Sequence, residues 1–107
     1  MRFKIIISIF LLLSLLLGCH DSKHNIERRK GFLSGLHVRL QKIGFKNVHT
    51  GYDDDEAKQA RANVYRLHSA NVIRLRQAGF LQIMKSLGFE YLTLVSLETK
   101  ETEIIEF

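Results

Sequence analysis

The clearest reactive group in the sequence is the thiol of Cys19, which is the only cysteine among 107 residues. It follows Gly18, at the end of an apolar run over residues 5–17 that only two serines interrupt. Because a lone cysteine has no partner within the chain, the sequence excludes an intramolecular disulfide. The chemistry of this thiol must therefore follow from its position after a small residue and an apolar segment.

Other groups that could do chemistry are scattered or too few. His20 and His24 are four residues apart, beside Asp21, but a structural zinc ion takes four ligands. Residues 53–56, DDDE, lack the spacing and the distal glutamate of a calcium loop and are expected to cap a helix. The sequence contains no Gly-x-Ser-x-Gly, His-Glu-x-x-His or glycine-rich phosphate motif. We therefore expect no enzymatic activity, no catalytic residue, no metal and no cofactor.

Residues 1–17 have the properties of an export signal. Arg2 and Lys4 give a positive amino terminus, which stays on the cytoplasmic side during export. The 13-residue apolar run would span about 20 Å as a helix, less than the roughly 30 Å hydrocarbon core of a bilayer. These lengths favour a cleaved signal peptide over a permanent transmembrane helix. An uncleaved anchor helix and an ordinary signal with a chance cysteine are the alternatives.

The motif Leu16-Leu17-Gly18-Cys19 resembles the lipobox of bacterial lipoproteins, in which an aliphatic and a small residue precede the cysteine. The resemblance covers only residues 1–19 of the chain. It implies that the chain is cut between Gly18 and Cys19, and that the Cys19 thiol carries a diacylglycerol. Two or three acyl chains, such as palmitate, would then give a long-lived attachment to the membrane.

The same resemblance implies an address in the cell envelope, facing the periplasm. In enterobacterial lipoproteins, an aspartate directly after the lipidated cysteine favours the inner membrane. Here His20 takes that position, and Asp21 comes one residue later. The outer membrane is therefore preferred over the inner membrane.

The expected organisation is a signal peptide at 1–18, a lipidated cysteine with a polar tether at 19–29, and a small α/β globular domain at 30–107. The charge is uneven, since residues 20–88 carry +7 and residues 89–107 carry −4. This asymmetry favours internal complementarity, a partner that presents both signs, or attraction to anionic lipid headgroups. The basic residues are not interleaved with aromatic side chains, so no nucleic-acid partner is expected. The candidate contacts with a protein partner or with lipid are Arg28, Arg29, Lys30, Arg66, Arg74 and Arg76.

The predicted fold is α+β, with about three helices against a short, mostly antiparallel sheet that ends in a C-terminal hairpin over residues 89–107. Apolar spacing predicts a helix from about Gly31 that Gly44 ends, followed by a strand over residues 45–50. Two similar segments, LQKIGFKNV from Leu40 and MKSLGFEYL from Met84, each predict a helix end, a Gly-Phe pair and a strand start. Two such units favour strands in one sheet. In architecture alone they resemble the ring-building domains of lipid-anchored secretion-system proteins.

Residues 57–78 admit two interpretations. Apolar residues in a narrow arc at 100° per residue predict one long helix that starts at the acidic residues 53–56 and ends at Gly79. The repeat of ANVYRL as ANVIRL, eight residues later, instead permits a β-hairpin that turns at Ser69-Ala70. The helix is our preferred prediction, with its arginines as a solvated face or a docking patch.

These features favour a non-catalytic interaction or accessory subunit of the cell envelope, for example in a secretion or conjugation apparatus. The alternative is an immunity or exclusion lipoprotein that protects the cell from an incoming toxin, phage or plasmid. Besides the arginines, the terminal residues 104–107, IIEF, could form an exposed strand that a partner captures by edge pairing. The sequence predicts neither the partner nor the oligomeric state.

Overall fold

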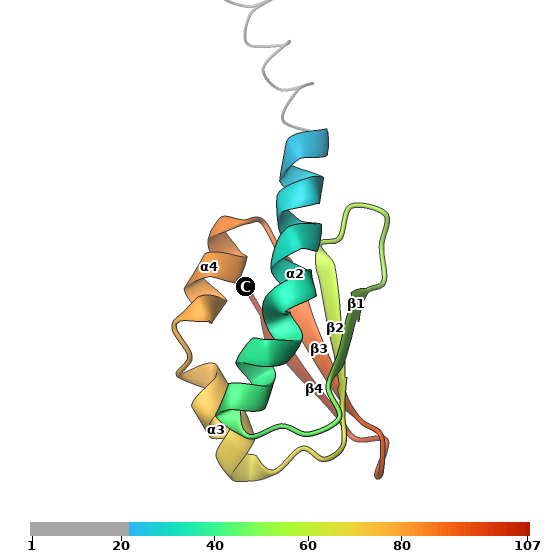
Figure 1. The fold of residues 1–107 in the computed structure, drawn as a ribbon, viewed down its shortest axis with the longest axis vertical. Coiled ribbons are helices and arrows are strands. Elements are labelled where there is room, and N and C mark those ends of the chain that lie inside the picture. The colour runs from blue at the N-terminus through green and yellow to red at the C-terminus, as the bar shows by residue number, and fades with distance from the viewer. Residues whose placement is uncertain (1–21) are drawn as a thin grey trace, which may run out of the picture.

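A computed structural model describes residues 22–107, in which three helices cover one face of a four-stranded sheet (Figure 1). This is the small two-layer α+β arrangement expected from the sequence, so the predicted fold class is confirmed. None of the helices in this part of the chain is both long and apolar enough to cross a bilayer. In chain order the elements are α2 (Lys23–Ile43), β1 (His49–Tyr52), β2 (Gln59–Val64), α3 (Ser69–Arg76), α4 (Phe80–Ser86), β3 (Tyr91–Ser96) and β4 (Thr102–Glu106).

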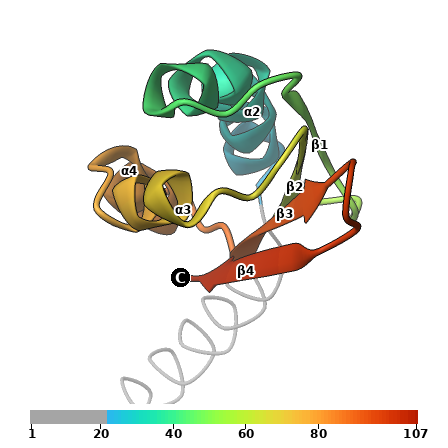
Figure 2. The same cartoon turned by 90° about the horizontal axis from the view of Figure 1, so that it is seen from below.

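The sheet has the strand order β1-β2-β3-β4, with antiparallel pairs at both sides and a parallel pair, β2 and β3, in the middle. A parallel pair needs a crossover connection, and α3 and α4 supply it. Figure 2 shows all three helices on the same side of the sheet. The last two strands form the predicted C-terminal hairpin, with Tyr91 opposite Glu106 and Val95 opposite Thr102.

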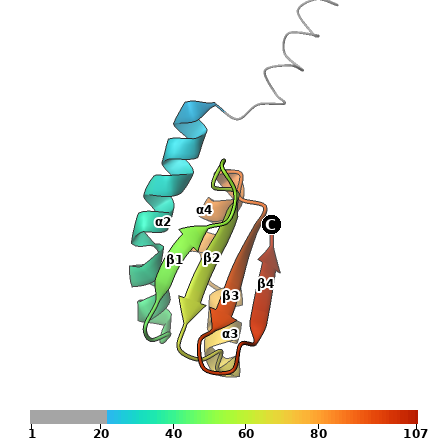
Figure 3. The same cartoon turned by 90° about the vertical axis from the view of Figure 1, so that its right-hand side faces the viewer.

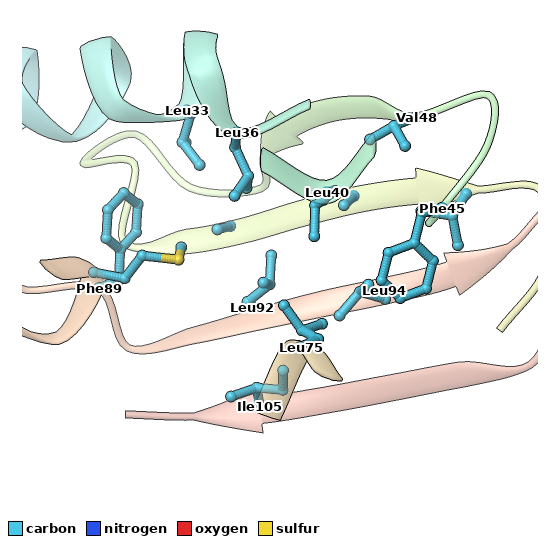
Figure 4. Close-up of a cluster of buried hydrophobic side chains, with 14 of the residues drawn as sticks. Leu33, Leu36, Leu40, Phe45, Val48, Leu75, Phe89, Leu92, Leu94 and Ile105 are labelled. Atoms are coloured by element: carbon cyan, nitrogen blue, oxygen red, sulfur yellow. The ribbon is translucent and has the colours of Figure 1, made fainter. Parts of the chain in front are cut away.

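The core lies between the helices and the inner face of the sheet. Leu36 and Leu40 of α2 are fully buried and point toward the strands (Figure 4). Leu92 and Leu94 of β3 meet them from the sheet, and Ile105 extends the core to β4. Because side chains alternate along a strand, the residues between these positions lie on the uncovered face.

Both predicted Gly-Phe pairs end a helix in the same way. Gly44 and Gly88 have φ angles of 130° and 91°, a region that favours glycine. After each glycine the phenylalanine N–H returns to the last helical turn, from Phe45 to the Leu40 carbonyl and from Phe89 to the Met84 carbonyl, at 3.2 Å in both cases. Both aromatic rings are buried, and each Gly-Phe pair precedes a strand of the same sheet, as predicted. The predicted strand over residues 45–50 is misplaced, because β1 comprises His49–Tyr52. The chain before it is bound back to α2 at Phe45 and turns at Asn47, whose φ of 52° does not fit an extended strand.

The predicted tether over residues 19–29 is wrong for its described part. The α2 helix already begins at Lys23, because the Ser22 side chain accepts the Asn25 N–H at 3.1 Å and caps the first turn. The helix therefore runs without a break from Lys23 into the segment where the sequence predicted a helix, from about Gly31 onward. Gly18 and Cys19, with the predicted signal peptide and the start of the predicted tether, lie outside the described residues.

The predicted helix over residues 57–78 is also wrong, and so is the alternative hairpin. The Asp54 carboxylate accepts the N–H groups of Lys58 at 3.1 Å and Gln59 at 2.8 Å, so the acidic run orders a loop instead of a helix start. The next residues form β2, a central strand that both β1 and β3 hydrogen-bond. The first copy of the repeat thus begins in β2, whereas the second copy lies in α3.

Candidate functional site

The six predicted cationic contacts do not gather into one patch. Arg28 and Lys30 are exposed on the first turns of α2, where the Lys30 ammonium lies 5.4 Å from the centre of the Tyr52 ring. Arg74 donates to the Ile43 carbonyl at 3.3 Å. Most of these groups therefore make contacts within the domain, and they are spread over several elements.

Arg29 was predicted as a surface contact, but it is only 1% exposed. Its Nε donates to the Glu56 carbonyl and its Nη1 to the Leu87 carbonyl, both at 3.0 Å. These carbonyls belong to the loop before β2 and to the end of α4, which lie far apart in the sequence. The prediction of a partner or lipid contact for Arg29 is therefore wrong, because the side chain joins three parts of the fold.

Two further arginines form ion pairs with the acidic C-terminal hairpin. Arg66 pairs with Glu98, with Nη2 to Oε1 at 2.8 Å, and Arg76 pairs with Glu103. The hydrogen bond from Arg66 holds the pKa of Glu98 below its ordinary value, and Coulomb attraction adds to this. Both pairs are partly exposed, so they contribute little to stability individually. They do account for part of the charge asymmetry as internal complementarity.

The strongest candidate interaction feature is the outer side of β4, where the sequence predicted a strand open to capture. The Ser96 N–H donates to the Glu101 carbonyl and the Phe107 N–H to the Glu90 carbonyl, so odd-numbered residues direct their backbone groups toward β3. The N–H and C=O groups of Thr102, Ile104 and Glu106 therefore point away from the sheet. We call these outward groups the β4 edge. Figure 3 shows β4 at the margin of the sheet, with no strand beyond it.

A hollow of about 400 Å³ lies beside this edge, on the helix side of the sheet. It is bounded by residues 76–79, at the end of α3 and in the turn before α4, by Leu81, Gln82 and Lys85 of α4, and by residues 105–107. We call it the β4 groove. Its lining combines apolar side chains with amide groups and the cations of Arg76 and Lys85, so it suits a strand that carries both apolar and acidic side chains.

The sequence predicts the β4 strand but not the groove beside it. The groove needs α4 to lie over β4, and this placement depends on the crossover between β2 and β3. The spacing of Gln82 and Lys85, three residues apart, does put both on one helix face and was an available signal. Among residues 22–107, no group of three or more histidine, cysteine, aspartate or glutamate side chains is arranged to hold a metal ion.

Comparison with known proteins gives no relative from which a site could be transferred. The chain matches no family model, no curated protein and no solved structure at a significant level.

Proposed function

We propose that this protein is a membrane-anchored bacterial lipoprotein that acts as a non-catalytic interaction or accessory subunit in the cell envelope, for example of a secretion or conjugation apparatus. The observation that carries the proposal is the sequence of residues 1–19, with its positive start, short apolar run and lipobox-like end at Cys19. A diacylglyceryl group on the Cys19 thiol, with further acylation of the new amino terminus, supplies the anchor.

The position of the domain supports this role. The α2 helix begins at Lys23, only four residues after Cys19. A lipid on Cys19 would therefore hold the folded domain close to the membrane surface and restrict which proteins it can meet. Arg28 and Lys30, exposed at the start of α2, would face this surface and could approach anionic headgroups.

The β4 edge and the β4 groove support the interaction role. A strand with one unpaired edge is a template for another strand, and the adjacent groove offers a hollow for its side chains. We therefore assign protein contacts to this side of the domain, and membrane attachment to the other end of the chain.

Metabolic labelling with a palmitate analogue tests the anchor. We expect the wild-type chain to carry label and to sediment with the outer membrane, and the C19S variant to lose both properties. Unlabelled wild-type protein, or a C19S variant that behaves like the parent, would contradict the proposal.

Crosslinking in intact cells tests the interaction role separately. I104P removes an outward N–H group from the β4 edge, whereas I104T keeps it. We expect the wild type and I104T to form crosslinked species that I104P loses. If I104P keeps every species, the β4 edge is not the interaction surface.

A further inference from the structure

We propose that the β4 edge binds the β4 edge of a second copy of this chain, antiparallel, about a twofold axis through Ile104. The two four-stranded sheets would become one continuous sheet of eight strands. The inference deepens the interaction role proposed for the β4 edge and rests on it, but it does not depend on the lipid anchor.

The backbone restricts the register of such a pair. In an antiparallel pair, two residues exchange hydrogen bonds only where the groups of both point across the gap. The twofold axis can therefore pass through any of residues 102–106: at an even-numbered residue it falls within a hydrogen-bonded pair, and at Glu103 or Ile105 it falls between two such pairs. An axis at Ile104 gives the longest overlap: Ile104 pairs with Ile104 of the second copy, and Thr102 pairs with Glu106 at both sides. An axis at Glu106 would instead set two carboxylates against each other.

The side chains on the helix side are complementary in this register. Glu101 of the second copy would lie opposite Phe107, at the mouth of the β4 groove and beside Lys85. Neither Glu101 nor Lys85 has an ion-pair partner within residues 22–107 of one copy. Pairing the two copies would therefore place an acidic group of each beside a cationic group of the other, twice by symmetry.

The apolar side chains also favour a second copy. Ile104 is 51% exposed, although it occupies the middle of β4. On the twofold axis, the two Ile104 side chains would cover each other on the uncovered face of the sheet. An unrelated basic peptide would match the glutamates of β4 but not Lys85 and Arg76 beside the groove. A second copy presents both signs, which agrees with the opposite charges of residues 20–88 and 89–107.

The arrangement is compatible with anchoring of both copies in one membrane. The twofold axis is perpendicular to the sheet, so both helical layers lie on the same side of the joined sheet. With this axis along the membrane normal, the amino-terminal ends of both α2 helices are at the same height. Both lipid anchors could then reach the same bilayer.

Sedimentation of the full chain in density-matched detergent tests the proposal. We expect a concentration-dependent dimer, and we expect I104P to weaken it about tenfold or more, because both copies lose a central donor. The N–H of Ile104 does not bond to β3, so proline there leaves the hairpin ladder intact. I104T keeps this donor and is the matched control, and circular dichroism checks that each variant is folded. A wild-type chain that stays monomeric at about 100 µM overturns the proposal, as does a dimer that folded I104P leaves unchanged.

A charge swap tests the register without altering β4. We expect K85E and E101K each to weaken the dimer several-fold, and the K85E/E101K double variant to regain most of the loss. K42E changes an exposed cation of α2, away from β4, and is the charge control. If I104P fails to fold, these charge variants provide the test of the dimer. Failure of the double variant to recover the dimer refutes the register through Ile104. If dimerisation fails while palmitate labelling succeeds, the anchor stands and only the second-copy inference is lost.

Discussion

Replacement of Arg29 by methionine should destabilise the domain strongly, although the residue lies in a highly charged segment, RRK. Methionine keeps much of the apolar volume of the side chain but removes every donor of the guanidinium. The carbonyls of Glu56 and Leu87, both 3.0 Å from Arg29 nitrogens, would lose these bonds. A hydrogen bond to a charged group contributes about 1.5–3 kcal/mol, so losing two should cost about 3 kcal/mol or more.

Urea and thermal unfolding of the purified full chain in a non-ionic detergent would measure this loss. About 3 kcal/mol corresponds to a fall in Tm of roughly 12–24 °C for a domain of this size. R28M is the matched control, because Arg28 precedes Arg29 on α2 and is exposed. We expect R28M to change the free energy of unfolding by less than about 0.5 kcal/mol. An R29M variant within about 1 kcal/mol of R28M would refute the structural role of Arg29.

Three further predictions concern local features. G44A should lower the free energy of unfolding by about 1–3 kcal/mol, because a Cβ at φ 130° would lie 2.7 Å from Asn71 Oδ1. G35A, which has open space on α2, should raise it by about 0.5–1 kcal/mol. Equal effects of the two variants in thermal unfolding would contradict this prediction. D54A should have a free energy of unfolding about 1 kcal/mol lower than that of the exposed control D55A, because only Asp54 accepts the Lys58 and Gln59 N–H groups. Equal stability of the two variants in urea unfolding would contradict this. The pKa of Glu98 is lowered in the fold, so its ion pair stabilises the protein above the ordinary carboxyl pKa. This stabilisation is lost as the pH falls through the pKa of the folded state, so the difference in stability between wild type and E98Q should shrink from pH 6 to pH 2. A constant difference would argue against the ion pair.

Local signals predicted those parts of the fold that depend on a few neighbouring residues. Gly44, which follows an apolar stripe, ends α2. Gly88 likewise ends the helical region that precedes β3. Alternation along the last segment predicted the terminal hairpin and the open strand that contains Ile104. In each case, the conformation follows from backbone freedom or from side-chain periodicity within about ten residues.

Features that depend on distant segments were not predictable in this way. The alanines of Gln59–Val64 suit either a helix or a tightly packed central strand. The strand forms because this segment pairs with β3, which lies far along the chain. Arg29 is buried because the Glu56 and Leu87 carbonyls, 27 and 58 residues away in sequence, converge on it. The β4 groove likewise exists only after α4 has been placed beside β4. Sequence periodicity carries no information on such long-range contacts.

The most direct test of the lipid anchor is the intact mass of the protein purified from bacterial membranes, with sequencing of its amino-terminal peptide. We expect a chain that begins at Cys19, with the mass of a diacylglyceryl group on the sulfur and an acyl chain on the amino terminus. A chain that still begins at Met1, or a mature chain with an unmodified Cys19 thiol, would contradict it.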